Sequence, residues 1–213
     1  MESYPGELFY KPKKLDVEKS AGTYLFFDTE TTGLPRNWNA AVDDLNNWPR
    51  LVQIAFEFYK NGEKINNGNY IIKPEGFYIS EETSNIHGIT NERAQNEGMP
   101  LWMVLREFKN LVEQADFLVA HNMSFDEKII GAEFLRLNMQ NSLAAKQTIC
   151  TKEISTDFCK IPGPVGKDGY KWPKLSELHL KLFNEDFGDS HNAAADVSAT
   201  AKCFWELRKR GVI

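Results

Sequence analysis

Two acidic residues beside an apolar segment are the first candidates for chemistry. Asp28 and Glu30 follow Tyr24–Phe27, four consecutive apolar residues that lie between Gly22 and Gly33. Such a run predicts a short strand that is buried on both faces. Because side chains alternate along a strand, both carboxylates should project from one face, about 7 Å apart. They would favour a divalent cation such as magnesium, although two hydrated acids at a solvent-exposed strand end are the alternative.

A third acid follows a second apolar run. Phe117–Ala120 predicts a buried strand, and Asp126 falls in the first turn of the helix that comes next. Ser124 and Glu127 have the spacing of a capping box for that helix. Ligand sites of α/β sheets form just beyond such strand ends, so we expect Asp126 in a solvated pocket there.

A fourth acid and a histidine lie near the C-terminus. Asp196 shares one face of a helix predicted over 193–210 with Cys203 and Leu207, and a carboxylate on a core-facing surface requires a partner. His191 lies in the loop that enters this helix. A lone histidine is usually structural, but beside metal-binding acids a general base is the better interpretation. We therefore expect one pocket that contains Asp28, Glu30, Asp126 and Asp196, with His191 at its rim.

The remaining pattern predicts one mixed α/β domain. Further strands are expected at 51–59, at 69–73 after a turn at Asn61-Gly62, and at 147–151. Helices are expected at 79–89, from Pro100 to about 113, and at 175–183. Together they predict a mixed five-stranded sheet, three antiparallel strands and then two parallel ones, with helices on both faces. Residues 1–22 are expected to form an N-terminal arm and 23–213 the single domain.

Composition limits the partners. The chain has 213 residues, 42% of them hydrophobic, and no apolar run near the roughly 18 residues that span a bilayer. Its three cysteines are widely spaced and there is no signal peptide, so we expect reduced thiols in the cytoplasm and no membrane association. The net charge of −5 disfavours a broad electrostatic grip on a duplex. Any contact with nucleic acid should be local.

Two loops could supply such contacts. Residues 35–49 are rich in turn formers and carry Trp38 and Trp48, which could stack on a base or pack against the domain. Residues 161–174 interleave lysines with Tyr170 and Trp172, a pattern that suits either nucleic-acid contact or a solvent-facing loop.

Three motifs resemble those of a known family. The DEDDh group of 3′→5′ exonucleases, which has a ribonuclease-H-like fold, carries three spaced exonuclease motifs. It includes the proofreading subunit of the bacterial replicative polymerase, ribonuclease T and several stand-alone enzymes. The similar stretches here are Asp28-x-Glu30-Thr31-Thr32-Gly33, His121-Asn122-x-x-Phe125-Asp126 and His191-Asn192-Ala193-x-x-Asp196.

The resemblance implies specific roles. The four acids would hold two magnesium or manganese ions, and His191 would accept a proton from the water that attacks the scissile phosphate. The products would be nucleoside 5′-monophosphates. Leu34 would wedge against the last bases, and His87 and Phe125 would line the pocket of the terminal nucleotide. The substrate-binding set that the resemblance implies is Thr31, Gly33, Leu34, His87, Asn122 and Phe125.

The substrate stays open at this point. We expect single-stranded or frayed DNA ends, with RNA 3′ ends as the alternative, because recognition of the 2′-hydroxyl depends on pocket geometry. A non-catalytic nucleic-acid-binding module is a third hypothesis, but clustered acids would repel the phosphates of its ligand. Only three residues follow Arg210, which favours a stand-alone nuclease over a polymerase subunit. Protein partners are not predicted.

Overall fold

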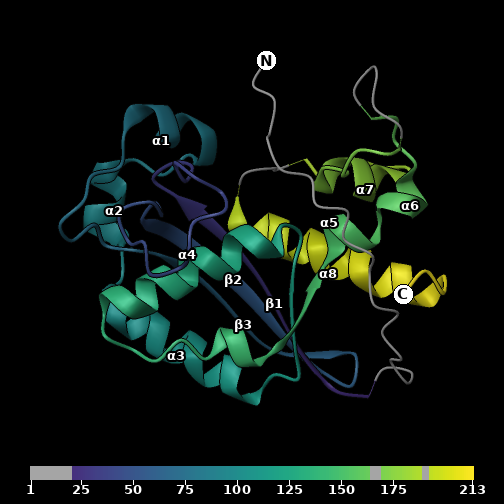
Figure 1. Ribbon diagram of the computed structural model, residues 1–213, viewed down its shortest axis with the longest axis horizontal. Coiled ribbons are helices and arrows are strands. Elements are labelled where there is room, and N and C mark those ends of the chain that lie inside the picture. Colours follow the sequence, from purple (N-terminus) through teal and green to yellow (C-terminus); the bar gives the residue numbers. More distant parts are fainter. Residues whose placement is uncertain (1–20, 164–168, 189–191) are drawn as a thin grey trace.

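A mixed sheet runs through the middle of the molecule (Figure 1). The computed structural model describes residues 21–163, 169–188 and 192–213, so most of the expected arm lies outside the described residues. Within them, five strands form one sheet: β1 (Thr23–Thr31), β2 (Leu51–Lys60), β3 (Glu63–Ile71), β4 (Phe117–Ala120) and β5 (Gln147–Cys150). Their order is β3-β2-β1-β4-β5, with the first two pairings antiparallel and the last two parallel. The predicted sheet topology is confirmed.

Helices fill the connections. They are α1 (Glu81–His87), α2 (Asn91–Glu97), α3 (Leu101–Gln114), α4 (Met123–Arg136), the short 3₁₀ helix η1 (Leu143–Ala145), α5 (Thr151–Ile154), α6 (Thr156–Cys159), α7 (Leu175–Phe183) and α8 (Ala193–Lys209). Gly88 ends α1 in the left-handed conformation, with φ of 72°, as its place after His87 predicts. In the described part of the chain, no helix is long and apolar enough to cross a membrane.

The alternation along β1 decides where the acids point. Leu25 and Phe27 belong to the core cluster that α3 and α4 complete. Tyr24 and Phe26 belong to a second cluster on the opposite face, which α8 completes. Figure 1 shows α5, α6 and α7 gathered over α8. Because side chains alternate, Asp28 and Glu30 continue the face of Tyr24 and Phe26 and are directed towards the α8 side.

Strand β3 is longer than predicted. It begins at Glu63, six residues before the expected start, because Asn61 and Gly62 adopt left-handed φ values of 53° and 83° and form a tight hairpin turn. Its first five residues, 63–67, are exposed and all but Ile65 are polar, so no apolar alternation marks them. Pairing with β2 overrides that weak local preference.

The predicted capping box is wrong. Helix α4 begins at Met123, because the carbonyl of Asn122 already accepts a hydrogen bond of 2.8 Å from the Phe125 amide. Ser124 therefore lies inside the helix, and no side chain caps its first turn. The side-chain oxygen of Asn122 accepts instead from Lys152, at 2.6 Å.

A buried ion network joins α4 to the loop before β2. Glu133 is fully buried, and its Oε1 accepts from Arg50 Nε at 2.8 Å and lies 2.9 Å from Arg136 Nη1. Arg136 Nη2 also donates to the carbonyls of Leu45 and Trp48, at 2.7 Å each. The network fixes the end of the 35–49 loop against the domain.

We expect Glu133→Ala to lower the free energy of unfolding by about 3–5 kcal/mol, because two arginines lose their buried counter-charge. Equilibrium denaturation in urea measures this loss. Glu113→Ala is the matched control, since Glu113 forms an exposed pair with Lys109 whose loss should cost below about 0.5 kcal/mol. Equal losses for the two variants would contradict a structural role for the network.

Candidate active site

Three carboxylates converge from two elements. Asp28 and Glu30 project from β1, and Asp196 lies in the first turn of α8. One carboxylate oxygen of each lies within 4.8 Å of those of the other two, and all three residues are half-buried. This spacing lets one hard cation accept oxygen ligands from all three residues.

Asp126 lies beside this group but deeper. It is 2% exposed, so the expected solvated environment is wrong. Its Oδ1 accepts from the Thr29 amide at 3.1 Å and from Thr29 Oγ1 at 2.7 Å, which fixes the carboxylate against β1. Thr29 lies between Asp28 and Glu30 on β1, so these hydrogen bonds hold Asp126 against the strand that carries both acids.

Burial raises the pKa values of three of the acids, and neighbouring carboxylates add to this effect for Asp28 and Glu30. Burial, followed by the charges of Asp126, Asp196 and Glu30, raises the pKa of Asp28 well above its usual value. Burial and the charges of Asp196 and Asp126 raise the pKa of Glu30 to about 8. Burial raises the pKa of Asp126 to about 7, against the hydrogen bonds from Thr29 and the charge of Lys152. A divalent cation would relieve this repulsion, so the residues present fit a metal centre.

This electrostatic strain predicts a pH-dependent stability. Because the folded pKa values of Glu30 and Asp126 lie above their ordinary values of 4.5 and 3.8, the destabilisation is absent below those ordinary values. It grows as the pH rises and is complete above about 8. In chelator, the melting temperature should therefore fall between pH 5 and 8, and Mg²⁺ or Mn²⁺ should restore it most at the upper end. A melting temperature that is independent of metal throughout this range would contradict a metal centre.

The turn after β1 contains part of the predicted substrate-binding set. Thr31 Oγ1 donates to the Gly33 carbonyl at 2.6 Å, and Gly33 has a left-handed φ of 147°. Leu34 is 69% exposed, so its side chain is available to a ligand beside the acids.

His87 and Phe125 are two further members of the predicted substrate-binding set. His87 is buried, and its Nδ1 accepts a hydrogen bond from the Ile89 amide at 3.1 Å. Burial lowers the pKa of His87 below its ordinary value, and the Thr31 backbone opposes this shift. Its ring therefore lies against the end of β1. Phe125 is half-buried, and its ring centroid lies 5.6 Å from that of Trp38.

The two loop tryptophans have different environments. Trp48 is buried in the α3–α4 core and donates from Nε1 to the Ala41 carbonyl at 2.8 Å. Trp38 is 36% exposed and lies beside Phe125. Of the two indoles, that of Trp38 is therefore the more exposed.

The fifth predicted functional residue, His191, lies outside the described residues. Asn192, which follows it, caps α8 by accepting a hydrogen bond from the Ala194 amide at 3.1 Å. The described chain therefore resumes one residue after His191, four residues before Asp196.

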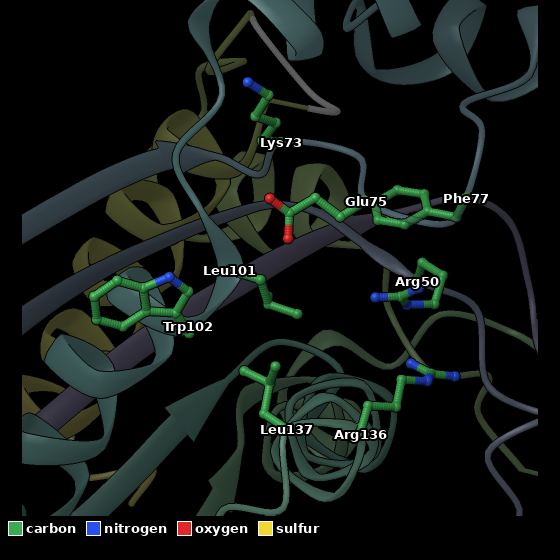
Figure 2. A pocket seen from close by; sticks show the side chains of 8 residues that line it. All are labelled: Arg50, Lys73, Glu75, Phe77, Leu101, Trp102, Arg136 and Leu137. Atoms are coloured by element: carbon green, nitrogen blue, oxygen red, sulfur yellow. The ribbon is translucent and has the colours of Figure 1, made fainter.

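A separate pocket lies on the other side of the sheet. It has a volume of about 280 Å³, and its lining includes Leu101 and Trp102 of α3 together with Arg50 and Arg136 (Figure 2). Leu101 belongs to the α3–α4 cluster, whereas the acids are directed towards α8. The pocket is thus distinct from the acidic group.

Sequence reasoning missed Lys152 and gave Trp172 only an open interpretation. Lys152 Nζ lies 4.3 Å from the centroid of the Trp172 ring and hydrogen-bonds Asn122. The available signal was that Lys152 follows the carboxyl end of a predicted parallel strand, where ligand sites tend to form.

The β3-β2-β1-β4-β5 sheet order fits the expected ribonuclease-H-like fold, and acids from β1, α4 and α8 lie beside this sheet. A family model described as "Exonuclease" matches residues 25–204. The chain belongs to this exonuclease family, which confirms the resemblance noted in the motifs.

Relatives and solved structures agree with this assignment. The PolC-type DNA polymerase III of Listeria monocytogenes is 32% identical over 187 residues, which cover 88% of this chain and 11% of the polymerase. Its Lactococcus lactis counterpart is 36% identical over 203 residues, with 92% and 11% covered. The chain thus spans about a tenth of the length of these relatives.

The solved structures show the same fold. E. coli exonuclease I in a complex with single-stranded DNA has a TM-score of 0.68 at 20% identity, over 89% of this chain and 41% of the other. A moderately thermophilic exonuclease I from Methylocaldum szegediense has a TM-score of 0.67 at 18% identity, with 89% and 41% covered.

Proposed function

We propose that the chain is a metal-dependent 3′→5′ exonuclease that releases nucleoside 5′-monophosphates from single-stranded or frayed DNA ends. The observation that carries this proposal is the convergence of the oxygens of Asp28, Glu30 and Asp196 within 4.8 Å, beside Asp126. Membership of the exonuclease family supports it. A binding module would gain nothing from acids whose charges oppose one another and would repel phosphate.

The acids divide into two sets of metal ligands in this proposal. Asp28, Glu30 and Asp196 would hold one magnesium or manganese ion, and Asp28 with Asp126 the second. When bound, such ions stabilise developing negative charge and lower the pKa of water to produce a nucleophile. The hydrogen bonds from Thr29 keep the Asp126 carboxylate in place, and His191 accepts the proton of the attacking water.

The binding set would position the strand end. The exposed Leu34 separates the last bases, and Phe125 and His87 line the pocket for the terminal nucleotide. DNA is favoured because the relatives include DNA polymerases and a structural neighbour holds single-stranded DNA. The net charge of −5 favours such a local grip. The buried free thiols of all three cysteines favour work in the cytoplasm.

The substrate class is tested by a time course on 5′-labelled single-stranded DNA, RNA of matched sequence and blunt duplex DNA, each with Mg²⁺ or Mn²⁺. We expect a ladder that shortens by one nucleotide from the 3′ end, fastest on single-stranded DNA. Faster shortening of RNA would overturn the DNA assignment. Binding without cleavage of any substrate would favour the binding-module hypothesis.

A further inference from the structure

Lys152 lies at the carboxyl ends of the parallel strands β4 and β5, on the side of the acids. It is in the first turn of α5, directly after β5, and its amide donates to the His121 carbonyl at 3.2 Å, just after β4. Its Nζ donates to Asn122 Oδ1 at 2.6 Å, in the same turn that leads into the helix carrying Asp126. Burial raises the pKa of Asp126, and the positive charge of Lys152 opposes that rise.

Trp172 lies beside this lysine and is exposed. The ring centroid lies 4.3 Å from Lys152 Nζ, and the residue is 50% exposed. The neighbouring Pro173 carbonyl is 3.1 Å from His121 Nε2, while His121 Nδ1 is 2.9 Å from Thr151 Oγ1. Burial lowers the pKa of His121 to about 4, so the imidazole that contacts Thr151 and Pro173 stays neutral at physiological pH. The indole is therefore positioned before any ligand arrives.

A second lysine–aromatic pair shows what a purely structural contact of this kind looks like. Lys202 Nζ lies 4.1 Å from the Phe183 ring centroid, but its charge is neutralised by Glu185 at 2.8 Å. Lys152, by contrast, forms no ion pair within 4.0 Å among the described residues, and its close partner is a neutral amide. A lysine without a close ion pair among the described residues and an exposed indole, both beside the acids, are the two parts that a nucleotide subsite needs.

We propose that Lys152 and Trp172 form a nucleotide subsite for single-stranded nucleic acid, in which the ammonium group binds a backbone phosphate and the indole stacks on a base. This inference rests on the proposed function for its substrate class. The subsite gives a chain of net charge −5 a local cation beside its metal centre. It tolerates any sequence, because every base offers a flat face for stacking.

Binding without turnover tests the subsite. Fluorescence anisotropy of a fluorescein-labelled oligothymidylate in chelator compares the full chain with Trp172→Ala and Lys152→Met. Trp172→Ala should weaken binding by roughly 5- to 100-fold. Lys152→Met should weaken binding and reduce the slope of log affinity against log salt by about 0.7, the value for one phosphate contact on a single strand. Lys152→Arg should retain that slope.

Matched controls separate this effect from a general loss of structure. Trp102→Ala removes a tryptophan that is also 50% exposed, on α3, and Lys202→Met removes the neutralised lysine–aromatic pair. Both should bind as the unaltered chain does, and thermal melting verifies that each variant folds. In cleavage assays, the two subsite variants should raise KM with little change in kcat.

The outcomes distinguish the subsite from the activity. Wild-type affinity and salt slope in both subsite variants, or equal losses in the two controls, would overturn the subsite even if the chain cleaves DNA. Selective loss of binding in a chain that cleaves no substrate would support the subsite and overturn the proposed function.

Discussion

Asp126→Asn should reduce the cleavage rate by roughly a thousandfold or more, because bound metal supplies several kcal/mol to the transition state and each 1.4 kcal/mol is tenfold in rate. The fold should survive. The asparagine Oδ1 can still accept the hydrogen bonds from the Thr29 amide and hydroxyl. Alanine would leave both donors buried and unpaired, at a cost of about 1–3 kcal/mol each, so asparagine is the cleaner substitution.

The chain provides a matched control for this variant. Asp116 accepts the same two kinds of hydrogen bond, from the amide and hydroxyl of Thr23 at 2.8 and 2.9 Å, just before β4. Asp116→Asn should leave the single-turnover rate unchanged. A chain with Asp126→Asn that retains most of its activity would contradict the assignment of Asp126 as a metal ligand.

His191→Ala should slow cleavage by about 10²- to 10⁴-fold, the usual contribution of a general base. The loss should shrink at high pH, where hydroxide is already available. The variant should still show the thermal stabilisation by Mn²⁺ at pH 8, because a base is not a metal ligand. A rate loss that is independent of pH, or a loss of the metal-dependent stabilisation, would contradict the role of general base.

Strong local signals made the framework predictable. The apolar run Phe117–Ala120 coincides with β4, and the small-residue segment starting at Ala193 coincides with the start of α8. Alternation in β1 correctly placed Asp28 and Glu30 on one face, because a strand's period is fixed by backbone geometry. Asp196 joins them because α8 packs closely against that face.

What the sequence could not predict depends on contacts between distant segments. The burial of Asp126 follows from its hydrogen bonds to Thr29, 97 positions away. The hydrogen bond from Lys152 to Asn122 joins residues 30 positions apart. Asn122 is the residue before α4, where the predicted capping box was wrong. The early start of β3 similarly depends on pairing with β2, because its first five residues are exposed and all but Ile65 are polar.

The central claim is that the acids form a metal centre that shortens DNA from its 3′ end. The most direct measurement is the single-turnover shortening of 5′-labelled single-stranded DNA by the unaltered chain and by Asp28→Asn, with Mg²⁺ and with chelator. We predict a one-nucleotide ladder only for the unaltered chain with metal. An equal ladder in chelator or with Asp28→Asn would contradict the claim, as would products shortened from the 5′ end.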